Sequence, residues 1–311
     1  MACAPLAFRG IVDPMDHTTL IRRPRLRGPV LLAAFDGWND AGEAATTALD
    51  AVAEGLGAET FATVDPEEFY DFQATRPTVR MVEGRRRIEW PATELRAARL
   101  PAADHDLIVV RGHEPNLRWR TFADEIVELA ANLRVEMVVT VGALLADVPH
   151  TRPVQVVSSA GDRDLAERLG LNLSRYEGPT GILGVLGDAA AREGIPTIGL
   201  WAALPHYLNL APNPWGAMAL IHELGRLLPM AVDTSDLAGQ TAAFDAAVDE
   251  LVDDNPELAG YIERLEADSD DQDEDEVDDE EGSPGLADVP PEELVAEVER
   301  YLRDHPGGTR G

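Results

Sequence analysis

The amino-acid sequence predicts an α/β fold built on a largely parallel β-sheet. Two observations predict it. Apolar segments of strand length alternate with segments of helical periodicity, and most of the strand segments are apolar throughout rather than at every second residue. A strand that is apolar on both sides is buried on both faces, which requires a layer of helices on each side of the sheet. We therefore expect one layered core domain over residues 29–232.

In the first half of this core, apolar runs mark the strands and turn residues mark the helix starts. The elements predicted there are a strand at Pro29–Phe35, a helix over about residues 41–54 with Asp40 as its N-cap, a strand at Phe61–Val64, and hairpin strands at 77–82 and 85–90. The rest of residues 65–100 has no clear pattern.

The second half alternates more regularly. The predicted elements are a strand at Asp106–Arg111, a helix at Leu117–Leu133, strands at Glu136–Val141 and Pro153–Ser158, a helix at Arg163–Leu169, a helix from Gly181 to Arg192, a strand at Pro196–Trp201, and a helix at Pro214–Leu228. Right-handed crossovers between parallel strands would bring the loops that follow them to one edge of the sheet.

The two ends of the chain differ from the core. Residues 1–28 carry three prolines without periodicity, which predicts a flexible N-terminal extension. Residues 233–267 predict a helical appendage with amphipathic helices at Ser235–Asp253 and Pro256–Ala267. Eleven of the 14 residues from 268 to 281 are acidic, which predicts a disordered acidic linker over 268–289. A short helix and tail are expected at 290–311.

The charge is concentrated in the last quarter of the chain. Residues 233–311 hold 27 acids and 4 arginines, net −23, so residues 1–232 hold the remaining 30 acids and 22 bases, net −8. Phosphate backbones and anionic lipids require a basic surface, so we expect neither nucleic acid nor membrane as a partner. The sequence has no secretory-type apolar segment and no run of membrane-spanning length, so we expect a cytoplasmic protein.

The residue types present exclude several chemistries. All 26 basic residues are arginine, which rules out Schiff-base catalysis and nucleotide sites that depend on lysine. The single cysteine, Cys3, excludes a cysteine-ligated zinc site, and the seven histidines show no metal-binding spacing. We therefore expect no metal and no cofactor, and we assign no residue as catalytic.

Polar residues follow several of the predicted strands. Residues in these loops are suited to general acid–base chemistry or to binding an anion if the strand ends converge. The candidate binding residues are Asp36, Gly37, Trp38, Asn39, Asp40, Arg111, His113, Glu114, Asp147, His150, His206 and Tyr207. Structural roles compete with this interpretation, because Asp40 is suited to capping a helix and Asp147 to starting a turn.

Four segments together resemble the proteasome assembly chaperone-2 family, in its bacterial branch. They are Leu31–Gly42, Val141–Pro153, Gly178–Ile182 and Trp201–Tyr207, which occur in the family's order within residues 29–265. The resemblance implies a phosphorylase/hydrolase-like three-layer sandwich that self-associates, with a trimer among the possible arrangements. It also implies a role in binding protein partners, for which proteasome α-subunits are the candidates, and no accepted catalytic residues.

Three functional hypotheses remain open at this point. The first is a non-enzymatic, homo-oligomeric protein that resembles a proteasome assembly chaperone. The second is a small-molecule enzyme, hydrolase/phosphorylase-like or ligase-like, that uses Asp36, Asp40, His113, Glu114 and His150. In the third, the acidic C-terminal segment masks a basic surface on a partner or on the protein's own oligomer.

Overall fold

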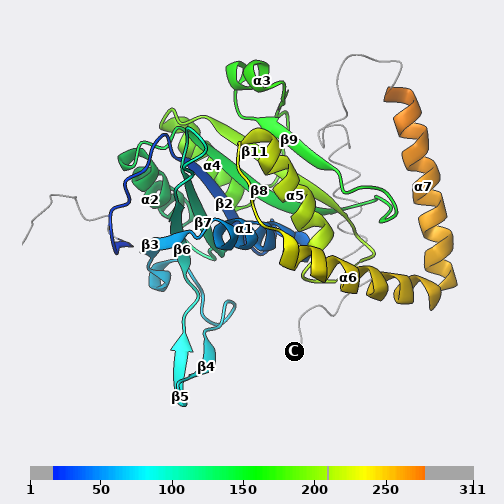
Figure 1. The fold of residues 1–311 in the computed structure, drawn as a ribbon, viewed down its shortest axis with the longest axis horizontal. Helices are drawn as coiled ribbons and strands as arrows, with labels where there is room; N and C mark the ends of the chain where they lie inside the picture. Colours follow the sequence, from blue (N-terminus) through cyan, green and yellow to red (C-terminus); the bar gives the residue numbers. More distant parts are fainter. Residues whose placement is uncertain (1–16, 209, 277–311) are drawn as a thin grey trace, which may run out of the picture.

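The computed structural model describes residues 17–208 and 210–276. They form one large sheet covered by helices on both faces, with a small hairpin and two further helices outside it (Figure 1). The strands of the large sheet are β1 (Thr18–Leu20), β2 (Val30–Asp36), β3 (Glu59–Val64), β6 (Thr93–Ala98), β7 (Leu107–His113), β8 (Met137–Ala146), β9 (Val156–Ala160), β10 (Asn172–Leu173) and β11 (Thr197–Pro205).

The centre of the sheet is parallel, as predicted. The strand order is β1-β3-β6-β7-β2-β8-β11-β9-β10, and β7, β2, β8 and β11 run in the same direction. Toward one side, β6, β3 and β1 continue the sheet by antiparallel pairing, and β9 pairs antiparallel with β11 on the other side. The sheet is therefore mixed, with its parallel part where the uniformly apolar sequences lie.

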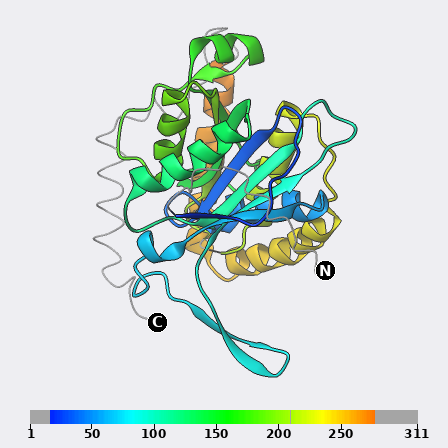
Figure 2. The same cartoon turned by 90° about the vertical axis from the view of Figure 1, so that its left-hand side faces the viewer.

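The helices form two layers. The helices of the core are α1 (Ala44–Gly55), α2 (Trp119–Asn132), α3 (Arg163–Leu169), α4 (Ile182–Arg192) and α5 (Pro214–Leu227). The pair α1 and α5 packs on one face of the sheet and the pair α2 and α4 on the other, which Figure 2 shows edge-on. Strand β2 shows why: Leu32 and Ala34 belong to the α1–α5 core, whereas Leu31 and Phe35 belong to the α2–α4 core.

Two features of the first hundred residues differ from the sequence-based expectation. The predicted flexible extension is wrong for residues 17–28, because Thr18–Leu20 pairs with β3 and the Arg27 N–H donates to buried Asp106 at 2.7 Å. Residues 1–16 lie outside the described part. Strand β6 was not predicted, because Glu94 and Arg96 interrupt its apolar residues; in the structure these two side chains pair with each other at 3.0 Å.

The predicted hairpin is confirmed as β4 (Thr78–Val82) and β5 (Arg85–Glu89), which pair with each other and with no strand of the large sheet. In Figure 1 it projects from the body of the molecule, below β6. The hairpin enters β6 at the end where β6 lies beside the last residues of β7. It therefore projects beyond the carboxyl edge of the parallel strands.

Two helices follow the core. Helix α6 (Ser235–Asp253) has the predicted bounds and packs on α5, and α7 (Pro256–Glu276) follows at an angle to it (Figure 1). The prediction that the acidic linker begins at residue 268 is wrong for residues 268–276, which continue α7. Extending a formed helix fixes one residue per hydrogen bond and avoids the cost of a new nucleus. The predicted C-terminal helix at 290–311 lies outside the described residues.

Candidate functional site

The structure divides the twelve candidate residues into two groups and one outlier. The β2–β7 group follows strands β2 and β7, and its members are Asp36, Gly37, Trp38, Asn39, Asp40, His113 and Glu114. The β8–β11 group follows strands β8 and β11, and its members are Asp147, His150, His206 and Tyr207. The outlier is Arg111, which lies within β7 and pairs with Asp50 of helix α1 at 3.1 Å.

Glu114 links three segments of the β2–β7 group. Its Oε1 accepts hydrogen bonds from the Asn39 side-chain amide at 2.7 Å and from the Ile182 N–H at 2.9 Å. Ile182 is the first residue of α4, so this carboxylate occupies the position that an anionic ligand takes at a helix N-terminus. Gly181 makes the arrangement possible, because a Cβ there would lie 2.3 Å from the Asn39 side chain.

Asp40 is buried and caps helix α1. Its carboxylate accepts from the Ala45 N–H at 2.6 Å and from the N–H and hydroxyl of Thr46. Burial raises the pKa of Asp40 from 3.8 to about 6, against the opposing effect of these hydrogen bonds. The structural interpretation of Asp40, a helix cap, is therefore the one that the geometry supports.

Asp36 and His113 contact each other at the ends of β2 and β7. The distance between His113 Nδ1 and Asp36 Oδ2 is 2.8 Å, and both side chains are partly exposed. The hydrogen bond from His113 lowers the pKa of Asp36. Trp38, two residues after Asp36, is 67% exposed.

The β8–β11 group holds helix α7 against the core. His206 Nδ1 lies 3.0 Å from an Asp147 carboxylate oxygen, and the Tyr261 hydroxyl of α7 donates to the same oxygen at 3.0 Å. The Tyr261 ring also packs edge-to-face on His206 and Tyr207, with centroid distances of 5.6 and 6.0 Å. These residues form a seam between the strand ends and the C-terminal helix.

His150 completes this seam toward α5 and α6. The Tyr207 hydroxyl lies 2.8 Å from His150 Nδ1 and accepts from the His150 N–H at 2.7 Å. The His150 ring stacks on Trp215 of α5, whose indole in turn contacts Phe244 of α6. Burial lowers the pKa of His150 and raises that of Tyr207, so neutral side chains are favoured at this position.

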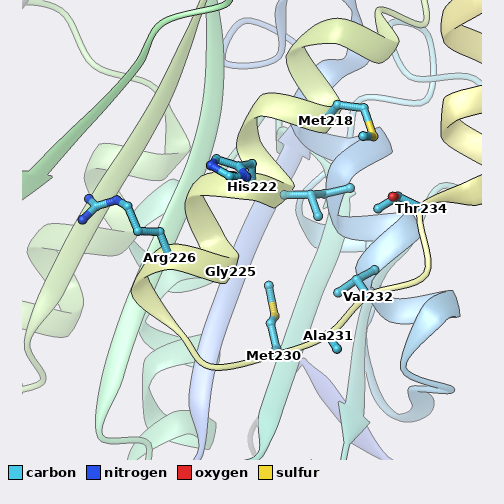
Figure 3. Close-up of a pocket in the computed structure, with 9 residues that line it drawn as sticks. Met218, His222, Gly225, Arg226, Met230, Ala231, Val232 and Thr234 are labelled. Atoms are coloured by element: carbon cyan, nitrogen blue, oxygen red, sulfur yellow. The ribbon is translucent and has the colours of Figure 1, made fainter.

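Sequence reasoning missed an open pocket of about 540 Å³ at the far end of α5 (Figure 3). Met218, His222 and Arg226 line it from α5, and Met230 and Val232 from the segment that leads to α6. Its Arg226 is engaged by Glu223 at 2.6 Å. No run of polar residues after a strand marks this place, so no sequence pattern points to it.

Within residues 17–208 and 210–276, no three His, Cys, Asp or Glu side chains are placed to hold a metal ion together. No helix in the same ranges combines the length and the apolar character needed to span a bilayer.

Comparisons with known proteins identify the family. The profile of the PAC2 family matches residues 34–252, which is more than half of the chain. The chain belongs to the PAC2 family. A PAC2 family protein from Streptomyces avermitilis is 45% identical, with a TM-score of 0.70, over 75% of this chain and 99% of that one.

Two other solved structures match this chain. A proteasome-assembly chaperone homologue from Mycobacterium tuberculosis is 43% identical, with a TM-score of 0.67, over 75% of this chain and 99% of that chain. An archaeal proteasome activator from Pyrococcus furiosus has a TM-score of 0.62 at 17% identity, over 76% of this chain and 99% of its own, and therefore shows the shared fold alone. None of the curated proteins searched matches this chain significantly.

Proposed function

We propose that this PAC2 protein is a non-enzymatic factor of the cytoplasm that binds protein partners in the manner of a proteasome assembly chaperone. The observation that carries the proposal is that the polar side chains at the strand ends bind other parts of the same fold. Glu114 and Asp40 cap helices α4 and α1, Asp147 holds α7 through Tyr261, and His150 stacks on Trp215 of α5. Groups that saturate each other in this way are structural rather than poised for a substrate.

The partners in this proposal are a second copy of the chain and proteasome α-subunits. The α-subunits are suggested by the relative from M. tuberculosis, which is described as a proteasome-assembly chaperone homologue. The fold agrees with a binding role, since large apolar side chains such as Trp38 and Met81 are exposed at the carboxyl edge and on the hairpin beside it.

Native mass spectrometry of the full chain, alone and mixed with proteasome α-subunits of the same organism, tests the proposal. We expect a defined mixed complex, or a change in the order in which the α-subunits assemble. An Asp36→Asn/His113→Ala variant serves as the control and should form the same complex, because these residues lie outside the binding role. Protein that neither associates with α-subunits nor alters their assembly would contradict the proposal.

A second candidate function, a small-molecule enzyme, is favoured by one observation. The Asp36–His113 pair is accessible and joined at 2.8 Å, an arrangement that suits general acid–base catalysis. The other residues of that hypothesis, Asp40, Glu114 and His150, are tied to backbone or ring partners. A ligand screen by thermal shift tests the enzyme hypothesis. A ligand that stabilises wild type but not His113→Ala supports it, and a screen in which no ligand stabilises wild type rules it out.

A further inference from the structure

The β4–β5 hairpin stands apart from every other element of the fold. Each residue from Thr78 to Trp90 is exposed, and the two strands pair only with each other. Figure 2 shows the hairpin extending from the body as a narrow arm. An isolated two-stranded hairpin is only marginally stable in water, so a partner surface would contribute to holding its shape.

One face of this arm carries apolar side chains beside a single arginine. The register places Val79 opposite Ile88 and, two residues further on the same face, Met81 opposite Arg86. The exposed fractions of the three apolar side chains, in that order, are 50%, 57% and 65%, and Trp90, where the apolar face reaches the base, is 52% exposed and contacts Phe72. Contiguous apolar side chains with this exposure mark interaction surfaces.

The arm is also cationic in a strongly acidic chain. Residues 78–89 hold four arginines and two glutamates, net +2, whereas the whole chain carries −31. Arg80 pairs with Glu89 at 2.5 Å, but none of the described carboxylates pairs with Arg85, Arg86 or Arg87. Charged side chains on both strands discourage edge-to-edge pairing, so the apolar face rather than a strand edge is the docking surface.

Helix α6 has the complementary character. It contains five acids and no basic residue. Its inner side packs through Leu237, Phe244 and Val248, which leaves Glu250 and Asp253 exposed beside the small exposed residues Ala242 and Ala246. Small side chains let the hairpin approach the helix closely, and the acids lie next to them, as Arg86 lies next to Met81 on the hairpin.

We propose that the apolar face of the β4–β5 hairpin docks on helix α6 of a second copy of this chain. The inference rests on the proposed protein-binding function and names one of its partners. A second copy supplies, in equal number, the acidic surface that the arginines require. Because the two contact surfaces differ, the contact either occurs twice in a twofold dimer or repeats around a closed ring.

Sedimentation velocity of the full-length protein over a range of concentrations tests the docking. Met81→Ser should weaken self-association about tenfold or more, because it removes an apolar side chain from the centre of the contact. Val82→Ser is the matched control. It changes the neighbouring residue on the opposite face of the same strand and should leave the association constant unchanged.

A charge swap tests whether α6 is the acceptor. Arg86→Glu, on the same face as Met81, and Glu250→Arg should each weaken self-association, and a chain that carries both changes should recover it. Equal melting temperatures for all variants would confirm that these exposed substitutions leave the fold intact.

Several results would overturn the docking. They are monomeric wild type at every concentration, self-association that Met81→Ser does not change, and a charge swap without recovery. If Met81→Ser instead lost only the complex with proteasome α-subunits, the hairpin would bind a foreign protein and the second-copy inference would be wrong. The proposed function would survive that result. It would fall if wild type bound no α-subunits, even with the self-association intact.

Discussion

The polar carboxyl edge of the sheet and the β4–β5 hairpin lie next to each other and differ in how far their side chains are satisfied. At the edge, Glu114 and Asp40 accept hydrogen bonds from helix N-termini, and the β8–β11 group is covered by α7. On the hairpin, Val79, Met81 and Ile88 face solvent together.

The difference shows that polar residues at strand ends are poor markers of a site when the fold itself uses them. Substitutions at the edge should therefore act on stability, and substitutions on the hairpin should act on association. Each of the following experiments can break that separation.

The largest expected effect is a pH dependence of stability at Asp40. Its pKa rises from 3.8 in the unfolded chain to about 6 in the folded one. The folded state thus holds the proton more tightly, and the contribution of Asp40 to stability is full below pH 4 and is lost as the pH rises past 6. The shift corresponds to about 3 kcal/mol.

Urea unfolding of wild type and Asp40→Asn at pH 4 and pH 7 measures the pH-dependent contribution of Asp40 to the unfolding free energy. The variant has no carboxyl group to titrate there and keeps the side-chain shape. The unfolding free energy of the variant relative to wild type should therefore be about 3 kcal/mol higher at pH 7 than at pH 4. A difference in unfolding free energy that is independent of pH would show that Asp40 is not buried as a cap.

The next effect is the loss of the Glu114 carboxylate. Glu114→Ala leaves the Asn39 amide and the Ile182 N–H without their acceptor, which should cost about 2 kcal/mol of unfolding free energy. Glu114→Gln retains an acceptor oxygen and should cost less than half as much. Chemical denaturation measures both values, and equal losses in the two variants would contradict the capping role. Neither variant should change self-association.

A smaller effect is expected where α7 meets the core. Tyr261→Phe removes the hydrogen bond to Asp147 and keeps the ring packing on His206 and Tyr207. At this partly exposed place the loss should be about 1 kcal/mol. Hydrogen exchange should accelerate in α7 and remain unchanged in β2, whereas uniform acceleration across the chain would show that α7 does not open separately.

The smallest effect on stability is expected on the hairpin. Met81→Ser alters a side chain that is 65% exposed, so the unfolding free energy should change by less than about 0.5 kcal/mol. Thermal unfolding of dilute protein, below the concentration at which it associates, measures this. A clear loss of stability there would mean that Met81 belongs to the fold and not to a contact surface.

The parallel core was accessible from sequence because its strands begin with continuous apolar runs, as in Val30–Asp36 and Leu107–His113. Strand β6 was not accessible from sequence, because the charges of Glu94 and Arg96 pair with each other only in the folded chain. The sequence predicts an extension over residues 17–28 because a three-residue strand such as β1 carries no periodicity.

The candidate site was predicted as one cluster and found as two groups because β8 and β11 continue to Ala146 and Pro205, beyond the predicted ends. Their loops then meet α6 and α7 instead of β2. The bond from Ile182 to Glu114 spans 68 residues, and local sequence patterns do not reveal which carboxylate will reach a distant helix. The hairpin was predicted, but its exposure is a property of the folded chain.

The most direct test of the account compares two variants by native mass spectrometry under the same conditions. One carries Met81→Ser/Ile88→Ser on the hairpin, and the other carries Asp36→Asn/His113→Ala at the edge. We predict that the hairpin variant is a monomer and that the edge variant assembles like wild type. An edge variant that loses assembly while the hairpin variant keeps it would contradict the account.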